Sequence, residues 1–380
     1  MDFEPTDVQR RMVDVVRAFA EKEVVPRAAE IDRTDEWPSD LYRQMAELGL
    51  LGMMLPVEYG GTAADTVTWT LCQEELARCS ASVAHTQLLC TIMGVLLLGH
   101  GSAAQRERWL SAMGRGEVIC VIAQTEPGGG SDVAGIQTTA RAADDGWVLN
   151  GTKRFITAAT VCDLAVVVAT TDRALGRDGI GLFLVEPGTP GFRHGSKDHV
   201  MGLHGVGTGE LVFDECRIPR SARLTGEAGG FKRAMESLNF GRVGIAAQAV
   251  GVAQAALDAA LAYARSRMAF GKPIAELQAI QFMLADMSTQ IEAARLLVRR
   301  AAALNDRGRP IAREAAEAKL MAAEMVVKVT SDALQIHGAS GYATDFPIER
   351  LYRDARVYPI FEGTSQIQRL VIARQMLRQG

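Results

Sequence analysis

The chain has 380 residues, of which 48% are hydrophobic and 23% are charged, and its formal net charge is -4. These values are ordinary for a globular protein of two or three domains, and the slight negative charge gives no reason to expect nucleic-acid binding. Six scattered cysteines with no C-x-x-C pair argue against a metal site and fit a reducing cytosol, so we expect a cytoplasmic protein.

The sequence gives no sign of a targeting or membrane segment. The first residues lack the basic and apolar regions of a secretory signal. The apolar run 88–98 is expected to be too short to span a bilayer, which takes about 20 residues. We therefore expect no membrane association.

Residues 1–115 are predicted to form an all-helical domain. Helix-spaced apolar residues predict a helix over 8–25, with Thr6 or Asp7 as its N-cap and Pro26 as a stop or kink. Residues 56–61 interrupt the pattern. Two further helices are then expected, over 66–78 and 82–99.

Residues 116–220 are predicted to form a mostly antiparallel β-domain, because valine, threonine and glycine become frequent and short apolar runs alternate with turns. The dipeptide Asn150-Gly151 lies between two apolar runs and predicts a tight hairpin turn. Pro219 is expected to close the domain. Strands are expected over 118–123, 164–170, 181–186 and 210–213.

Residues 221–380 are predicted to form a helical bundle, because long alanine-rich stretches without proline and with few aromatics indicate close helix packing. A loop is expected over 306–310. The helices are expected over 243–267, 276–304, 311–337 and 364–378.

Two short segments carry candidate chemistry. The glycine-rich loop 125–132 follows a predicted strand, and its backbone N–H groups could approach a phosphate or the edge of an electron-rich ring; it could equally be a flexible surface loop. It is not a G-x-G-x-x-G motif, and no Walker sequence occurs. Near the C-terminus, Glu362 lies among apolar and aromatic neighbours, where desolvation would make its carboxylate a better base.

These segments resemble motifs of the acyl-CoA dehydrogenases. The sequence 124–132 is similar to the family's TEPGxGSD segment, 155–157 to its W-I-T segment, 267–278 to its R-x-x-F-G stretch, and 335–342 to its Q-x-x-G-G-x-G-[FY] element. The loop 358–369 resembles the family's catalytic-base loop. The resemblance covers essentially the whole chain in order. It implies a mainly α fold with a central β-domain: an N-terminal helical domain, a middle β-barrel-like domain and a C-terminal four-helix bundle.

The resemblance implies FAD as cofactor and an acyl-CoA as substrate. Glu362 would remove the α-proton, since a subset of the family carries its base where Gly241 stands here and glycine cannot serve. The implied substrate contacts are Ser131, Asn239, Arg242 and Gly363. The implied FAD contacts are Ile122, Gln124, Thr125, Gly130, Ser131, Phe155, Thr157, Arg267, Phe270, Gln278, Gln335, Ala339, Thr364 and Gln366.

Some of these residues have a second interpretation. Phe155 could be an ordinary core residue, Thr364 and Gln366 could cap the last helix, and a lone His337 at a helix end is more often structural. Four positions differ from the family pattern. Ala339 stands where the family's 335–342 element has its second glycine. Phe155 replaces tryptophan, Asn239 replaces a frequent aspartate, and His204 replaces a common arginine.

The implied activity is FAD-dependent α,β-dehydrogenation of an acyl-CoA to the trans-2-enoyl thioester, within fatty acid metabolism, with electron-transferring flavoprotein as the expected acceptor. Arg267, Phe270 and Gln278 would reach a neighbouring subunit's FAD, so a homotetramer is expected. One alternative is an oxidase, or a dehydrogenase acting on a carrier-protein-bound acyl group. Another is a non-catalytic flavin-binding or structural protein on the same scaffold, which the presence of Glu362 argues against.

Overall fold

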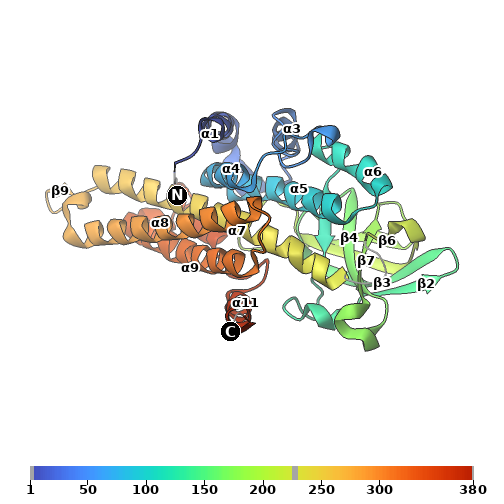
Figure 1. The fold of residues 1–380 in the computed structure, drawn as a ribbon. Coiled ribbons are helices and arrows are strands. Elements are labelled where there is room, and N and C mark those ends of the chain that lie inside the picture. The colour runs from blue at the N-terminus through green and yellow to red at the C-terminus, as the bar shows by residue number, and fades with distance from the viewer. Residues whose placement is uncertain (1–3, 225–229, 379–380) are drawn as a thin grey trace.

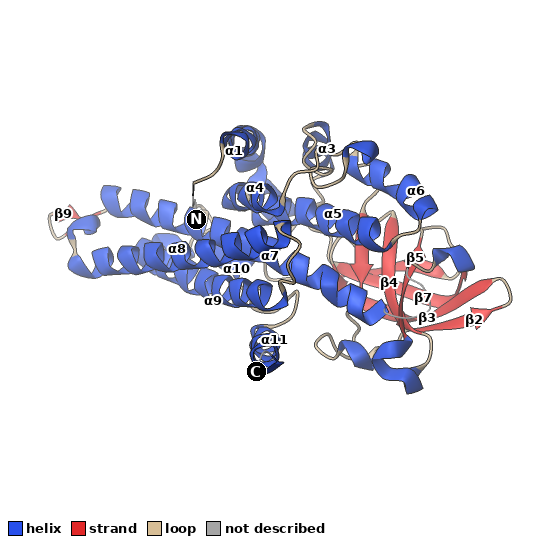
Figure 2. Ribbon diagram, in the orientation of Figure 1, coloured by secondary structure: helices blue, strands red, loops and turns tan. Residues whose placement is uncertain are grey.

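The computed structural model describes residues 4–224 and 230–378, and it places a β-sheet at one end of an elongated helical assembly (Figures 1 and 2). The N-terminal helices cover the upper side of both the sheet and the bundle (Figure 1). They are α1 (Asp7–Phe19), α2 (Ala28–Thr34), α3 (Ser39–Glu47), α4 (Thr66–Cys79), α5 (Ala81–His100) and α6 (Ala103–Gly114).

The predicted start of α1 is confirmed. The Thr6 side chain accepts from the Gln9 backbone N–H, and the Gln9 side chain accepts from the Thr6 N–H, which makes a capping box. Pro26 kinks the chain without ending its helical course, because a 3-10 turn over Val25–Arg27 leads directly into α2.

The middle region is a twisted sheet whose strand pairs are mostly antiparallel, as predicted, while β1 and β4 pair in parallel. Strands β2 and β6 were not predicted. Pro219 is the last residue of β7. The strands are β1 (Cys120–Ala123), β2 (Thr139–Ala143), β3 (Gly146–Ile156), β4 (Leu164–Thr170), β5 (Ile180–Val185), β6 (Phe192–Lys197) and β7 (Gly209–Pro219).

The hairpin predicted at Asn150-Gly151 is wrong. Strand β3 continues through both residues, and the pairing with β7 shifts register there instead of reversing. The Asn150 side chain donates to the Glu215 carboxylate and accepts from the Glu215 N–H, both at 2.8 Å, which stabilises a bulge. The chain reverses at Asp144-Asp145, between β2 and β3.

The C-terminal region is a bundle in which α7 (Gly230–Ser266) runs from the sheet to the far tip, and α8 (Gln278–Asp306) and α9 (Ala312–His337) pack along it (Figure 1). The tip carries the short strands β8 (Met268–Ala269) and β9 (Lys272–Pro273). The helix α11 (Ser365–Arg378) packs against α9, and α10 (Ile348–Ala355), which was not predicted, precedes the Glu362 loop.

Two helices, α5 and α7, are long and apolar enough to cross a membrane by length and composition alone. The predicted apolar run 88–98 is part of α5, which extends over 20 residues. The most apolar windows of α5 and α7 are 89% and 67% buried inside the protein. Their apolarity is thus accounted for by the core that they form between the N-terminal helices and the bundle.

Candidate active site

Glu362 lies in the loop between α10 and α11, in a backbone conformation that non-glycine residues seldom adopt, with φ of 53°. Gly363 follows with φ of 88°, and a side chain there would meet Gln368 Nε2 at 2.7 Å, so the position requires glycine. This double turn directs the Glu362 side chain inward. Its Oε2 is buried, and no donor among the described residues hydrogen-bonds to it.

The backbone of this loop is held by side chains from three helices. Arg242 of α7 donates from Nε to the Glu362 carbonyl at 3.2 Å, and Lys319 of α9 donates from Nζ to the Gly363 carbonyl at 2.7 Å. Gln368 of α11 donates from Nε2 to both carbonyls, at 3.2 and 2.8 Å. The loop is therefore fixed through its peptide groups, and its carboxylate stays free.

Burial raises the pKa of Glu362 above its usual range, and the nearby Arg242 and Lys319 cations offset part of that rise. Burial also lowers the pKa of Lys319 to about 8, against the pull of Glu362. The arrangement is a buried carboxylate with an increased affinity for protons, next to two buried cations. It suits a general base.

The predicted substrate contacts on α7 lie beside this carboxylate. Asn239 accepts from Arg242 Nη1 at 2.8 Å, which leaves Arg242 Nε for the Glu362 carbonyl. A side chain at Gly241 would lie 3.2 Å from Glu362 Oε2 and 2.9 Å from Ile92 Cδ1. The structure thus brings Asn239, Arg242 and Gly363 together with Glu362, and the absence of a Gly241 side chain keeps open the space in front of the base.

The glycine-rich loop is anchored by an ion pair that was not predicted. The buried Lys153 donates to the Gln124 carbonyl at 3.0 Å and to Glu126 Oε1 at 2.8 Å. The Glu126 carboxylate also accepts the backbone N–H groups of Gln137 and Thr138. Burial lowers the pKa of Lys153 to about 8, although the Glu126 contact opposes it.

Beyond this anchor, the loop is open. Gly130 and Ser131 are exposed, and a side chain added at Gly128 or Gly129 would meet nothing within 4 Å. Ile122 and Gln124 are half-buried at the end of β1. Gln124 Oε1 is buried with no hydrogen-bond partner among the described residues. An exposed glycine-rich backbone beside this amide oxygen fits the edge of a flavin ring.

Phe155 is not a core residue. It adopts a φ of 56° at the end of β3, its backbone N–H donates to Asp198 Oδ2, and the residue is 56% exposed. The alternative that it packs in the β-domain core is therefore wrong. Thr157, two residues on, is half-buried. An exposed aromatic ring held by a strained backbone is available to stack on a planar ligand.

A second group of predicted FAD contacts lies at the far tip of the bundle, where Phe270 is 90% exposed. Roughly 36 Å of helix α7 separates Arg242 from Ser266. Tyr263, near this end, stacks on His337 at 4.4 Å and donates to Ser340 Oγ, which places the segment after α9 at the same end. The group at this end comprises Arg267, Phe270, Gln278, Gln335 and Ala339.

Other residues have structural contacts. His337 is buried, and its Nδ1 lies 2.7 Å from the Ala333 carbonyl, in agreement with a structural role. Thr364 accepts from the Ile367 N–H at 3.3 Å, as an N-cap of α11 does, while Gln366 is exposed.

The wall behind Gly241 is filled by an aromatic pair. Trp69 of α4 stacks on Phe240 with ring centroids 4.6 Å apart. A side chain at Gly244, one turn beyond Gly241, would overlap the Trp69 ring and lie 2.8 Å from Leu88. Trp69 is fully buried, and its Nε1 donates to Gln87 Oε1 at 3.2 Å.

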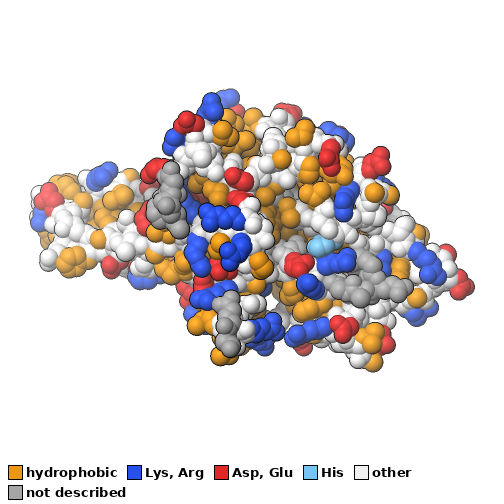
Figure 3. Space-filling model, viewed as in Figure 1, with side chains coloured by type: hydrophobic (Ala, Val, Ile, Leu, Met, Phe, Trp, Pro, Cys, Tyr) orange, Lys and Arg blue, Asp and Glu red, His pale blue; other side chains and the backbone are white. Residues whose placement is uncertain are grey.

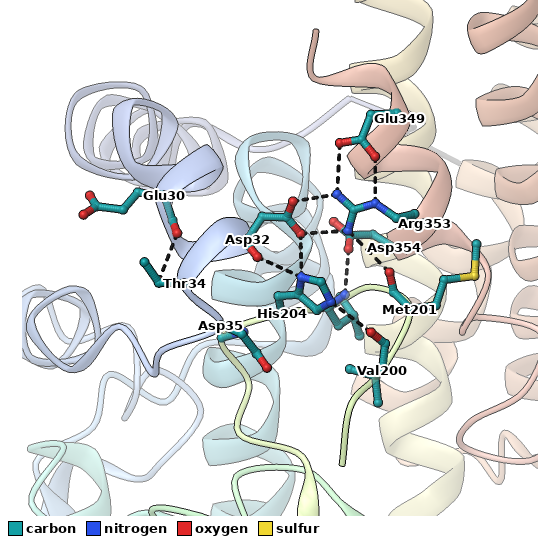
Figure 4. Close-up of polar contacts among 12 residues, drawn as sticks. Glu30, Asp32, Thr34, Asp35, Val200, Met201, His204, Glu349, Arg353 and Asp354 are labelled. Atoms are coloured by element: carbon teal, nitrogen blue, oxygen red, sulfur yellow. Dashed lines mark hydrogen bonds and ion pairs between the residues drawn. The ribbon is translucent and has the colours of Figure 1, made fainter. Parts of the chain in front are cut away.

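Asp32 links the three parts of the chain through His204 and Arg353 (Figure 4). The Nδ1 of His204 contacts the carbonyl and carboxylate of Asp32 on α2, and its Nε2 contacts the Val200 carbonyl. Asp32 also accepts a two-pronged contact from Arg353 of α10, at 2.9 and 2.6 Å. The loop 201–208 therefore contributes an interdomain junction through His204.

Several of these residues were missed by the sequence interpretation: Lys153, Lys319, Gln368 and Trp69. Each has a large polar or aromatic side chain, and each is completely buried. A lysine on the apolar face of an alanine-rich helix was the available signal for Lys319, because lysine is seldom buried without a partner.

Comparison with known proteins places these features in a family context. Family models for the N-terminal, middle and C-terminal domains of acyl-CoA dehydrogenases match residues 6–117, 121–216 and 228–377. The mitochondrial short-chain specific acyl-CoA dehydrogenase of Homo sapiens is 47% identical over 377 residues, covering 98% of this chain and 90% of that protein.

Solved structures extend the similarity to the whole fold. Butyryl-CoA dehydrogenase from Megasphaera elsdenii superimposes with a TM-score of 0.97 at 40% identity, with 100% of both chains covered. A chain from a structure described as the electron transferring flavoprotein of Acidaminococcus fermentans gives a TM-score of 0.97 at 41% identity and the same coverage.

Proposed function

Because the chain belongs to the acyl-CoA dehydrogenase family, we propose that it oxidises short-chain acyl-CoA thioesters with Glu362 as the catalytic base. The enzyme is an FAD-dependent oxidoreductase that acts on acyl-CoA. The observation that carries the assignment of the base is the buried, unpaired Oε2 of Glu362 beside two cations.

Catalysis by this chain's residues begins with the proton. Glu362 takes the α-proton of the thioester, and burial favours the transfer because it raises the proton affinity of the carboxylate. FAD, when bound, would supply the acceptor for the hydride that leaves the β-carbon. Gly241 leaves room for the acyl chain in front of Oε2, and the apolar surroundings supplied by Ile92 and Phe361 exclude water.

The residues present fit FAD. The exposed backbone of the glycine-rich loop, the Gln124 Oε1 and the exposed Phe155 offer polar and stacking contacts to a flavin. At the tip, Arg267 offers a cation for a pyrophosphate and Phe270 an aromatic face for an adenine.

A short acyl chain is favoured by the filled wall behind Gly241. Trp69 and Leu88 occupy the space next to Gly244, and the Gln87 hydrogen bond fixes the Trp69 ring. An acyl tail that passes Gly241 would meet this ring. The names of the related enzymes, short-chain specific and butyryl-CoA, support the same substrate class.

We propose a homotetramer, because one chain cannot bring both groups of predicted FAD contacts to one cofactor. The glycine-rich loop and Phe155 belong to the sheet, where α7 begins, whereas Arg267 and Phe270 follow the other end of α7, at the tip (Figure 1). The exposed Phe270 and Phe282 near the tip, and the hydrophobic side chains along that arm in Figure 3, support a subunit contact there.

Electron-transferring flavoprotein is the proposed acceptor, supported by the structural neighbour described under that name. A cytoplasmic location and a place in fatty acid metabolism stay predictions.

The test is a panel of acyl-CoAs of graded chain length and branching, assayed with an artificial electron acceptor. A maximum at four to six carbons, about the reach of a short pocket, supports the proposal, and a maximum at long chains contradicts the chain-length assignment. Oxygen consumption in the same assay would favour the oxidase alternative. Failure of every acyl-CoA to bleach the bound flavin would favour a carrier-bound substrate or the non-catalytic alternative.

A further inference from the structure

We propose that Lys319 is a positioning residue for catalysis: with Gln368 it fixes the loop that carries Glu362, and it places a buried positive charge beside that residue. This inference rests on the proposed role of Glu362 as base. Neither Lys319 nor Gln368 was predicted as a site residue. Their helices, α9 and α11, carry the predicted residues Gln335 and Gln366 elsewhere along their length.

The geometry shows why Lys319 is more than a core residue. Its side chain is completely buried in an alanine-rich helix, and its Nζ donates a hydrogen bond of 2.7 Å to the carbonyl of Gly363, the residue after the base. A lysine buried in this way is costly for the fold unless it is paired. Its contact is with a backbone carbonyl, and its charge acts on Glu362.

Gln368 donates to the same Gly363 carbonyl as Lys319, but its side chain carries no charge. It is also completely buried, and its Nε2 donates to the carbonyls of Glu362 and Gly363. Lys319 therefore contributes a hydrogen bond and a charge, whereas Gln368 contributes hydrogen bonds alone. This difference allows the two contributions to be separated.

The charges around Lys319 define the expected direction. Glu362 attracts the Lys319 proton, Arg242 repels it, and Glu324 on the same helix adds a further attraction. Conversely, the Lys319 and Arg242 cations lower the pKa of Glu362 against its burial. With the Lys319 charge removed, Glu362 holds its proton to a higher pH, so the ionised carboxylate that acts as the base forms only at that higher pH.

The experiment uses the FAD-loaded enzyme and a set of variants. Lys319→Met removes the charge and the donor, Lys319→Gln removes the charge but keeps a donor, and Lys319→Arg keeps the charge. Gln368→Leu removes hydrogen bonds without a change of charge. Lys328→Met is the matched control, because Lys328 lies on the same helix with its side chain 55% exposed, in an ion pair with Asp332.

Two measurements report proton removal by Glu362. The first is the pH dependence of anaerobic flavin reduction by the best acyl-CoA. The second is solvent deuterium exchange at the α-carbon, followed by NMR, of an acyl-CoA whose β-carbon is replaced by sulfur. That analogue has α-protons but no β-hydride, so exchange reports proton removal without oxidation. Thermal unfolding of each variant is measured alongside.

We expect the midpoint of the rising pH limb to move upward by about one pH unit in Lys319→Met and Lys319→Gln, the lower end of the effect of one nearby charge because Arg242 remains. Lys319→Arg should keep the wild-type midpoint. Gln368→Leu should slow both reactions by about tenfold without moving the midpoint, and Lys328→Met should change neither.

A purely structural role for Lys319 would lower the unfolding temperature while the pH limb of the folded enzyme stayed in place, and that result would overturn the proposal. If Lys319→Met does not fold, the pH midpoint of Lys319→Gln decides between the two roles, because the glutamine amide can still donate to the Gly363 carbonyl. Glu362→Gln is measured in the exchange assay as a separate check. Persistent exchange in Glu362→Gln would refute Glu362 as the base. If exchange is lost in Glu362→Gln but the pH midpoint of the Lys319 variants equals that of the wild type, only the role proposed for Lys319 is refuted.

Discussion

Replacement of Glu362 by glutamine tests the base most directly. The two side chains are nearly equal in size, so the loop held by Arg242, Lys319 and Gln368 through the carbonyls of residues 362 and 363 should persist. The amide cannot accept the α-proton. Gly241, the other position at which a side chain would reach this space, offers no carboxylate.

The expected loss follows from the environment of the carboxylate. Removal of a general base typically costs about 10²–10⁴-fold. Here the proton transfer starts the chemistry. Oε2 is buried and has no hydrogen-bond partner in the part of the chain that the structure describes, so water would not readily take over as the base. We therefore expect a loss near 10⁴-fold, which corresponds to about 5 kcal/mol of activation free energy.

The assay is anaerobic flavin reduction by a good acyl-CoA substrate, with bound FAD and unfolding temperature measured for each protein. Glu186→Gln is the matched control, because the Glu186 side chain is 41% exposed and pairs with Arg108 at 2.6 Å, outside the site described here. A Glu362→Gln enzyme that reduces its flavin within a few-fold of the wild-type rate would show that another group removes the proton, and the mechanism proposed here would be wrong.

Three further predictions concern the pocket wall, the bundle tip and the domain junction. Trp69→Ala should move the preferred acyl-CoA to longer chains at a cost of about 3–5 kcal/mol in stability, since the fully buried ring fills the wall at Gly244; an unchanged preference in the chain-length panel would contradict this. Arg267→Ala should release FAD more readily, and gel filtration and sedimentation would contradict the subunit-shared site if they found a fully FAD-loaded monomer. For His204, burial lowers the pKa, but the Val200 and Asp32 carbonyls and the Asp32 carboxylate raise it above its usual value overall. The contribution of His204 to stability should therefore be complete below about pH 6.5 and disappear as pH rises through the higher pKa of the folded state. The His204→Gln variant should lack this part of the pH dependence in denaturant unfolding, and identical profiles for the variant and the wild type would refute the prediction.

The sequence predicted those features that depend on local residues. The glycine-rich loop, the Glu362 segment and the Thr6 cap are each encoded within a few consecutive positions, and the order of helical and β regions follows from composition. The hairpin at Asn150-Gly151 was wrong for the same reason, because a short Asn-Gly signal does not distinguish a turn from a bulge. The bulge depends on Glu215, 65 positions away.

Contacts between distant segments could not be predicted in this way. Lys319 meets Gly363 across 44 positions, and Lys153 meets Glu126 across 27. Whether a lysine in a helix is buried depends on which helix packs over it, and periodicity alone leaves that open. The residues that position the site were therefore found only in the folded chain.

The way in which the Glu362 loop is held explains how a carboxylate can be both fixed and reactive. A direct hydrogen-bonded ion pair with Arg242 or Lys319 would fix the side chain, but it would also lower the pKa of Glu362 and weaken it as a base. Instead, both cations hydrogen-bond to backbone carbonyls of the loop, and Arg242 also donates from Nη1 to the Asn239 side chain. The cations then act on Glu362 through space, so its proton affinity is moderated without a bond that must break before the α-proton can be taken.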